Sequence, residues 1–405
     1  MDIEVRRIHP DELRATFVAV ETAFGGHLEE TFLAFHRPFI DPERTHAAFE
    51  GDAIVGSAGV SPFTMTVPGG EIPAAGVTGV GVMPSHRRRG VNTALMRAQL
   101  DDVHARGEPV AVLYASQGSI YGRYGYGIAS LNAAIDIETS RSAFGPWYTP
   151  SGRVRLFERD EAFAAFLPVY EEVCRSRPGM MRLDEREFAY RLDDRLMEHD
   201  KPVPGFFAGH ESDGRLDAYV QYRVKHGWDV VPQHELVVED LIGVTPQAYA
   251  DMWRYVLDVD LVHRVTAWNR PSDDPILHLV LEPGQLRLHV KDALWLRLID
   301  VEAALATRAY RAQTSLILDV RDVFCPWNEA RYELGGDEGG ATCRRTDAEP
   351  DLVLGVAELG AAFLGGTRLS TLHRAGRLEE RRPGAVDRAD TAFAWDPAPW
   401  CSFMF

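Results

Sequence analysis

Hydrophobic and polar positions in residues 1–145 follow patterns that predict strands and helices in turn. Apolar residues recur at helical spacing between Asp11 and Ala23. Ala53–Val60 and Phe63–Val67 alternate in polarity and predict two strands, with Ser61-Pro62 as the turn between them. A further apolar segment, Ala74–Met83, ends at a proline and predicts another strand.

Helical periodicity then extends from Val91 to Arg106, where Gly107 is expected to end the helix. The continuous apolar run Pro109–Tyr114 is typical of a buried strand. The order strand, helix, strand indicates an α/β fold.

Turn-rich segments divide the rest of the chain. Gly145-Pro146, Pro150-Ser151-Gly152 and Glu282-Pro283-Gly284 are typical of boundaries, and about 150 residues per domain suggests two or three domains in 405 residues. We expect domains over residues 1–150, 151–290 and 291–405. In the second and third domains the patterns predict helices over Glu161–Val173, Thr245–Leu257, Ala357–Leu364 and Thr367–Ala375, strands over Ala218–Val224, Leu236–Gly243, Leu294–Ile299 and Thr314–Val320, and a Gly-rich turn at Gly335–Gly340.

Composition narrows the class of protein. Hydrophobic residues make up 45% and charged residues 25% of the chain, which is ordinary for a globular protein. The net charge of −17 argues against a nucleic-acid partner and suits a cationic small molecule, although acidity also serves solubility alone. No apolar run reaches the roughly 18 residues of a membrane helix, and the N-terminus lacks the apolar core of a signal peptide, so we expect a cytoplasmic protein without a membrane partner.

Metal binding is not expected either. The four cysteines are far apart, with no Cys-x-x-Cys pair. The fourteen histidines include no His-Glu-x-x-His arrangement.

The segment Val80–Leu95 has the pattern of an anion site. It reads VGVMPSHRRRGVNTAL, an apolar strand followed by a basic turn that opens into a helix. Backbone N–H groups at a helix N-terminus bind anions. Gly90 allows close approach of a phosphate, and Arg88 and Arg89 add charge-assisted hydrogen bonds. A diphosphate therefore fits this turn.

Two other kinds of nucleotide-binding turn and a plain solvated turn are the alternatives for this segment. The Gly-Lys-[Ser/Thr] ending of a P-loop and the Gly-x-Gly-x-x-Gly of a dinucleotide fold are both absent. Three consecutive arginines are often just a solvated turn. The anion site is favoured because a second motif, Ser116–Tyr126 (SQGSIYGRYGY), follows the buried strand.

These two motifs carry a resemblance to a known family. Arg88–Val91 with Val80–Val82 resembles the acetyl-CoA signature of the GNAT acetyltransferases, and Tyr121–Tyr126 resembles their Tyr-x-x-x-Gly-aromatic motif. Within this superfamily the chain resembles the Eis (enhanced intracellular survival) aminoglycoside N-acetyltransferases over nearly its whole length, as far as the aromatic C-terminal Phe405.

The resemblance implies an architecture. It comprises two tandem GNAT-like domains, the second without a cofactor site, followed by a sterol-carrier-protein-like α/β domain. The corresponding turn of the second domain, Gly243–Pro246, has neither arginine nor a Gly-rich loop. The family also implies a homo-oligomer, a hexamer.

The resemblance further implies which residues act on acetyl-CoA. The backbone of Val80, Gly81 and Val82 would splay from its neighbouring strand and bind the acetyl group and pantetheine. The diphosphate would be held by the residues of the turn and first helical turn, and Ser116 and Gln117 would touch the cofactor. The residues expected to hold the diphosphate are Arg88, Arg89, Gly90, Val91, Asn92 and Thr93.

Two further residues would move protons. Tyr121 is the expected general acid, with a packed core tyrosine as the alternative, whereas Tyr124 and Tyr126 are expected to pack. The aromatic tail should be buried, because a large apolar side chain left in water costs about 1.5–3 kcal/mol. By resemblance the α-carboxylate of Phe405 would enter the N-terminal domain's site as the catalytic base, with simple docking of the tail as the alternative.

The implied activity is transfer of an acetyl group to amines of aminoglycosides, polyamines or lysine side chains. Acidic Glu29 and Glu30, with Phe24, Phe32 and Phe35, are candidates for an amine pocket, although ordinary surface and packing roles are the favoured interpretation of them. A lipid or small-ligand carrier with a vestigial acetyltransferase domain is the alternative function.

Overall fold

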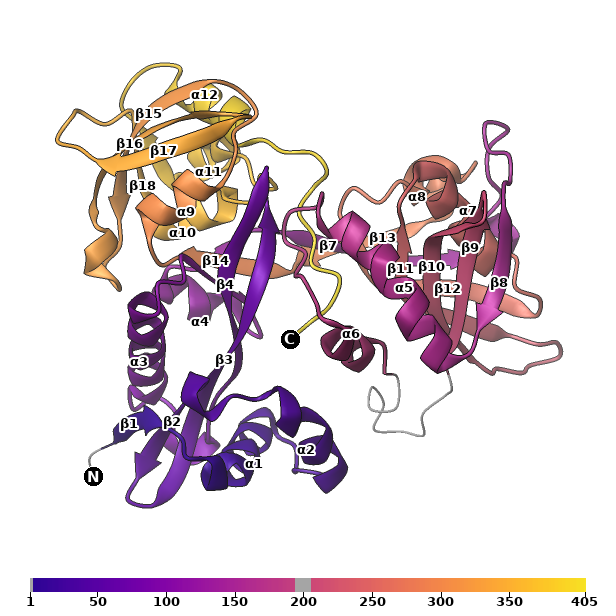
Figure 1. Cartoon of the computed structure of the whole chain (residues 1–405), viewed down its shortest axis with the longest axis horizontal. Helices are drawn as coiled ribbons and strands as arrows, with labels where there is room; N and C mark the ends of the chain where they lie inside the picture. The colour runs from indigo at the N-terminus through magenta and orange to yellow at the C-terminus, as the bar shows by residue number, and fades with distance from the viewer. Residues whose placement is uncertain (1–2, 194–204) are drawn as a thin grey trace. The chain divides into compact units, whose positions relative to one another are not determined.

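A computed structural model describes residues 3–193 and 205–405 as a mixed α/β protein with three β-sheets (Figure 1). The described chain forms two compact units. Unit 1 contains the residues up to Ala129, Leu294–Trp395 and Phe405, and unit 2 contains Ser130–Ala293 and Asp396–Met404.

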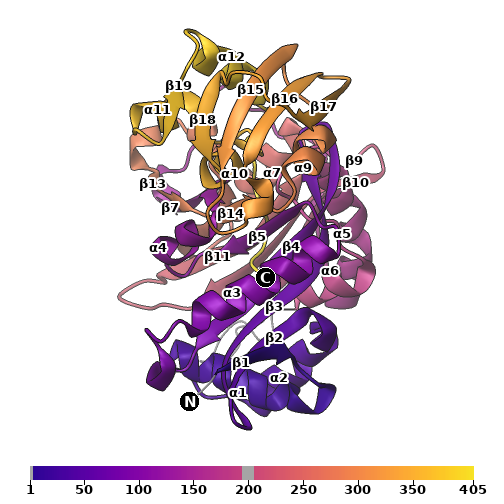
Figure 2. The same ribbon diagram turned by 90° about the vertical axis from the view of Figure 1, so that its left-hand side faces the viewer.

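The first sheet of unit 1 has seven strands in the order β1-β2-β3-β4-β5-β14-β6. Helix α3 lies along β3 and β4 (Figure 2) and buries its apolar face there. Gly107 ends α3 as predicted, donating its N–H to His104 O at 3.0 Å. The strands are β1 (Glu4–Arg7), β2 (Thr45–Glu50), β3 (Ala53–Val67), β4 (Gly70–Val82), β5 (Val110–Tyr114), β6 (Gly127–Ile128) and β14 (Leu294–Leu298), and the helices are α1 (Leu13–Phe24), α2 (Glu30–His36), α3 (Val91–Ala105) and α4 (Gly118–Tyr121).

The predicted turn at Ser61-Pro62 is wrong, because β3 is one continuous strand. Pro62 pairs with Ala75 of β4, whereas the pairing of β3 with β2 ends at Gly59. At Pro62 β3 is therefore paired on one side only, and strands with an unpaired edge tolerate proline.

A second sheet of unit 1 has five strands in the order β17-β16-β15-β18-β19. The predicted Gly-rich turn is shorter than expected, because Gly335 and Gly336 lie within β16 and Gly340 begins β17. The elements are α9 (Val301–Thr307), β15 (Thr314–Arg321), β16 (Ala330–Asp337), β17 (Gly340–Arg345), β18 (Leu352–Gly355), α10 (Val356–Ala362), α11 (Leu369–Arg374), β19 (Leu378–Glu380) and α12 (Ala385–Phe393).

Unit 2 is built on a seven-stranded sheet with the order β13-β7-β12-β11-β10-β9-β8. Helix α7 begins where the sequence predicts, and Thr245 is its N-cap, since the Thr245 side chain accepts from Ala248 N at 3.1 Å. The elements are β7 (Leu131–Glu138), β8 (Arg153–Phe157), α5 (Arg159–Cys174), α6 (Glu185–Leu192), β9 (Phe206–Ser212), β10 (Arg215–Lys225), β11 (His234–Gly243), α7 (Pro246–Leu257), β12 (Val262–Pro271), α8 (Ile276–Leu279) and β13 (Arg287–Asp292).

The chain passes between the units at places that differ from the expected domain boundaries at 150 and 290. It enters unit 2 at Ser130 and returns to unit 1 at Leu294. The cause is long-range strand pairing: β7 pairs with β12 and β13, whereas β14 pairs with β5 and β6.

Candidate active site

The two central strands of the first sheet part at their C-terminal ends. β4 pairs in parallel with β5 only over Ala74–Gly76. From Val77 to Val82, β4 pairs with β3 alone among the described strands. The backbone groups on the other edge of β4 are therefore available to an extended ligand. Val80, Gly81 and Val82 lie in this stretch.

The turn after β4 leads into α3 with its amides uncapped. Gly90 is the N-cap in a left-handed conformation with φ of 82°, and it has no side chain to accept from the first turn. The first intrahelical bond joins Ala94 N to Gly90 O. The N–H groups of Val91, Asn92 and Thr93 precede that bond, as at any helix start.

The three arginines of the turn have different partners. Arg87 donates to Val82 O at 3.2 Å and to Ala23 O, so it ties the turn to the end of β4 and to α1. Arg89 pairs with Glu50 at 2.9 Å. Arg88, at a left-handed φ of 63°, has no ion-pair partner among the described residues.

Glu50 and Arg87 are residues that sequence reasoning missed. Glu50 also contacts His86 Nε2 at 3.1 Å, and the hydrogen bonds from His86 and Arg89 hold the pKa of its carboxyl below the usual value. Only the position of Arg87 beside Arg88 could have drawn attention to it. Nothing in the sequence near Glu50 indicates its partners.

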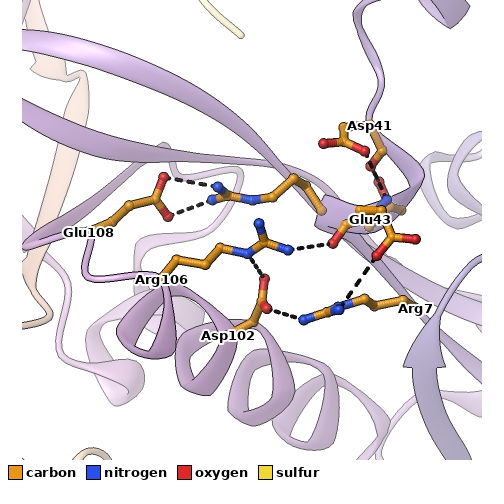
Figure 3. Close-up of polar contacts among 8 residues, drawn as sticks. Arg7, Asp41, Glu43, Asp102, Arg106 and Glu108 are labelled. Carbon is orange, nitrogen blue, oxygen red and sulfur yellow. Dashed lines mark hydrogen bonds and ion pairs between the residues drawn. The ribbon is translucent and has the colours of Figure 1, made fainter.

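Charged residues anchor the opposite end of α3. Figure 3 shows Asp102 between Arg7 and Arg106, at 2.5 and 2.9 Å. Burial alone would raise the pKa of Asp102, but the two guanidinium groups hold it below its usual value. The helix is thus fixed at its C-terminal end, with its amide end at the turn.

Tyr121 lies at the end of α4 and is 6% exposed. Burial raises the pKa of its hydroxyl above the usual value, and a hydrogen bond with Ser116 partly offsets this effect. The phenol therefore stays protonated at neutral pH. Ser116 and Gln117 are exposed, and Gln117 is the N-cap of α4.

The two neighbouring tyrosines differ from each other. Tyr126 packs as predicted, with its ring 6.1 Å from that of Tyr121 and no hydrogen-bond partner for its buried hydroxyl. Tyr124 also packs, but its hydroxyl contacts Asn92 Nδ2 at 3.1 Å and Thr93 Oγ1 at 3.2 Å. That connection to the first turn of α3 was not predicted.

The prediction of a buried C-terminal tail holds for Trp400, Cys401 and Ser402, whereas Phe403 and Phe405 are half-buried and Met404 is 58% exposed. Trp400 is 2% exposed within unit 2, where its backbone N–H donates to Pro178 O at 2.9 Å and its indole N–H donates to Asn269 Oδ1 at 3.3 Å. Phe405 belongs to unit 1, and its ring centroid lies 5.0 Å from that of Phe63 and 5.6 Å from that of Tyr114. Tyr114 is the last residue of β5, at the edge where β4 and β5 part.

The start of α7 contrasts with the start of α3. Thr245 caps one amide of α7, and Pro246 at its first position has no N–H. The start of α7 therefore offers fewer free N–H donors than the start of α3.

The candidate amine-pocket residues have partners of their own. Glu30 pairs with Arg14 at 2.6 Å on the surface. The ring of Phe32 lies 3.9 Å from that of His36 and 6.2 Å from that of Phe17. Phe24 is 62% exposed at the end of α1.

Comparisons with known proteins identify the family. Models of GNAT acetyltransferase domains match residues 4–129 and 179–298, and a sterol carrier protein domain model matches residues 301–402. The N-acetyltransferase Eis of Mycobacterium tuberculosis is 33% identical over 370 residues, covering 88% of this chain and 87% of that protein. The chain belongs to the Eis family.

Other Eis-like proteins match the full length. An uncharacterized N-acetyltransferase of Streptomyces avermitilis is 41% identical, with both chains fully covered. The crystal structure of Eis1 from Mycobacterium abscessus superimposes with a TM-score of 0.87 at 32% identity, again over the whole of both chains. The expected fold of two GNAT domains and a sterol-carrier-like domain is confirmed, and this Eis-family protein is an N-acetyltransferase.

The described residues contain no cluster of three or more His, Cys, Asp or Glu side chains able to hold a metal ion. Over the same residues, no helix combines the length and hydrophobicity needed to cross a bilayer. The expected oligomer and compartment stay predictions.

Proposed function

We propose that this Eis-family protein transfers the acetyl group of acetyl-CoA to primary amines. The observation that carries the proposal is the uncapped start of α3 beside the unpaired edge of β4. A diphosphate needs N–H donors and positive charge, and the amides of Val91–Thr93 with the unpaired Arg88 supply both. Arg89 would add a second positive charge to the diphosphate site, and its ion pair with Glu50 would orient its side chain.

The thioester end of acetyl-CoA would lie along Val80, Gly81 and Val82. Backbone N–H groups on the open edge of β4 would polarise the carbonyl, as donors placed where negative charge develops stabilise acyl transfer. Gly81 permits close packing on α1, since a Cβ there would come within 2.9 Å of Ala23 Cβ. Ser116 and Gln117 would contact the cofactor from the end of β5.

Two groups would handle the protons. As the amine nitrogen bonds to the carbonyl carbon and the carbon–sulfur bond breaks, the Tyr121 hydroxyl donates its proton to the departing sulfur. The Phe405 α-carboxylate accepts the proton that the ammonium group loses. A carboxylate with an ordinary pKa near ~3.5 is a weak base, so burial or a water relay must assist it. As the amide forms, the nitrogen loses a second proton, which restores the Tyr121 hydroxyl, and the proton on the carboxylate leaves to solvent.

The acceptor is proposed as a class, a cationic amine. The net charge of −17 favours attraction of cations. Aminoglycosides, polyamines and lysine side chains all present primary ammonium groups whose pKa is near ~10.4 and which must lose a proton before attack.

A thiol-release assay tests the proposal. The protein is incubated with acetyl-CoA and a panel of aminoglycosides, polyamines and lysine peptides, and acetyl-CoA binding is measured by calorimetry. We expect release with at least one amine class, and binding about 10-fold weaker for Arg88→Gln. Arg344→Gln, at an exposed pair on β17, is the matched control. Absence of binding heat and of thiol release with every amine would overturn the proposal.

A further inference from the structure

The Tyr124 hydroxyl joins two side chains of the first turn of α3. The Asn92 amide donates to the hydroxyl oxygen at 3.1 Å, and the hydroxyl proton is available to Thr93 Oγ1 at 3.2 Å. Asparagine and threonine near a helix start otherwise tend to bond nearby backbone N–H groups. The contacts with Tyr124 engage Asn92 Nδ2 and Thr93 Oγ1, and neither side chain accepts from a backbone N–H of that turn among the described residues.

A buried ion pair contacts the backbone carbonyl of Tyr124. Arg297 of β14 donates to Tyr124 O through Nη1 and to Asp322 Oδ2 through Nη2, the latter at 2.5 Å. Arg297 and Asp322 are 0% and 1% exposed. Gly125 makes room for the guanidinium, since a Cβ there would overlap Arg297 Nη1.

The segment that carries Asp322 belongs to the sterol-carrier-like domain and packs into the catalytic domain's core. The ring centroid of Phe324 lies 4.9 Å from that of Tyr124. The guanidinium of Arg97, in α3, lies over the Phe324 ring, 3.9 Å from its centroid. Cys325 is buried in the same apolar cluster as Tyr121, Tyr124 and Tyr126.

We propose that Tyr124 is a positioning residue for acetyl-CoA binding, and that the sterol-carrier-like domain sets its place through Asp322, Arg297 and Phe324. The hydroxyl keeps the first turn of α3 open to the diphosphate, and the ion pair and the Phe324 ring fix the hydroxyl. The inference rests on the proposed function of that turn. In this role the sterol-carrier-like domain supports the acetyltransferase site without binding a ligand itself.

The test compares two conservative variants. Tyr124→Phe keeps the ring and removes both hydrogen bonds, so we expect the Kd of acetyl-CoA in calorimetry to rise about 5- to 10-fold while kcat at saturation changes less than about 2-fold. Tyr310→Phe is the matched control, because this buried tyrosine donates only to Leu305 O at 2.9 Å. It should change thermal stability but not the Kd.

The outcomes separate this inference from the proposed function. If the unaltered protein does not bind acetyl-CoA, both are overturned. If it binds, and Tyr124→Phe binds as tightly as Tyr310→Phe, the positioning role alone is overturned. Phe324→Leu tests the coupling without exposing a buried charge: we expect the Kd to rise about 3-fold through looser packing on Tyr124. An unchanged Kd in that variant would overturn the role of the sterol-carrier-like domain.

Discussion

At the residue scale, three tyrosines within six positions have three different environments. Tyr121 is bonded to Ser116, Tyr124 to Asn92 and Thr93, and Tyr126 has a buried hydroxyl without a partner. Burial raises the pKa of Tyr121 and so keeps its proton available. The three identical side chains thus differ in their burial and in the hydrogen-bond partners of their hydroxyls.

Replacing Tyr121 by phenylalanine is expected to lower turnover by roughly 10²–10⁴-fold, because the leaving thiolate loses its proton donor. Acetyl-CoA affinity, measured by calorimetry, should change little. Tyr126→Phe is the matched control and should retain turnover, since its hydroxyl has no partner to lose. Normal turnover in Tyr121→Phe would remove this residue from the mechanism.

A buried histidine of unit 2 predicts a pH dependence of stability. Burial alone would lower the pKa of His210, but its hydrogen bonds with Asp217 and with Ser151 O, together with the charge of Asp251, raise it above the usual value. The contribution to stability is therefore complete below the unfolded pKa of about 6.5 and is lost as pH rises through the folded pKa. Urea unfolding across this range should show the decline, and His210→Gln should flatten it. If the free energy of unfolding depended on pH in the same way in His210→Gln and the parent protein, His210 would not be the group responsible.

At the scale of elements, α3 combines an open N-terminus with a fixed C-terminus. Around its C-terminal end, Arg44 donates twice to Glu108, at 2.6 and 3.0 Å, with side chains 7% and 11% exposed. Rigid placement of a helix whose first amides bind a ligand reduces the ordering that binding requires.

Arg44→Met is expected to destabilise unit 1 by about 3 kcal/mol, because it leaves the Glu108 carboxylate buried without its counter-ion. Denaturant unfolding measures the change. Arg344→Met breaks the exposed pair with Glu333 and should cost less than about 1 kcal/mol. An equal loss of unfolding free energy in the two variants would show that burial of the Arg44–Glu108 pair does not add to its contribution to stability.

At the scale of the whole molecule, the chain passes repeatedly between its two units. Residues 396–404 belong to unit 2, where Asn269 and Arg191 contact the carbonyls of Cys401 and Ser402 at 3.1 and 3.3 Å. Phe405 belongs to unit 1. The last residue thus packs with side chains remote in sequence, Phe63 and Tyr114.

Moving the terminal carboxylate is expected to abolish turnover. One glycine added after Phe405 displaces the charge, and a C-terminal amide made by peptide ligation removes it while keeping the length. Both variants should melt like the parent protein and release little thiol. A C-terminal amide with normal turnover would rule out the carboxylate as the base.

The sequence alone determined the features that depend on neighbouring residues. The strand, basic turn and helix at Val80–Leu95, the Thr245 cap and the aromatic tail can all be recognised locally, because period, capping and turn chemistry act over a few positions. The resemblance to the Eis family added the order of the domains.

Only the tertiary structure decided which distant groups meet. The pairing of β14 with β5, the Glu50–Arg89 pair and the bond from Arg297 to Tyr124 join segments up to 188 positions apart, as in Leu298↔Val110. The unbroken course of β3 through Pro62 likewise depends on its pairing with β4. Such contacts leave no periodic signal in the sequence, because they depend on how the sheet orders its strands rather than on the residues beside them.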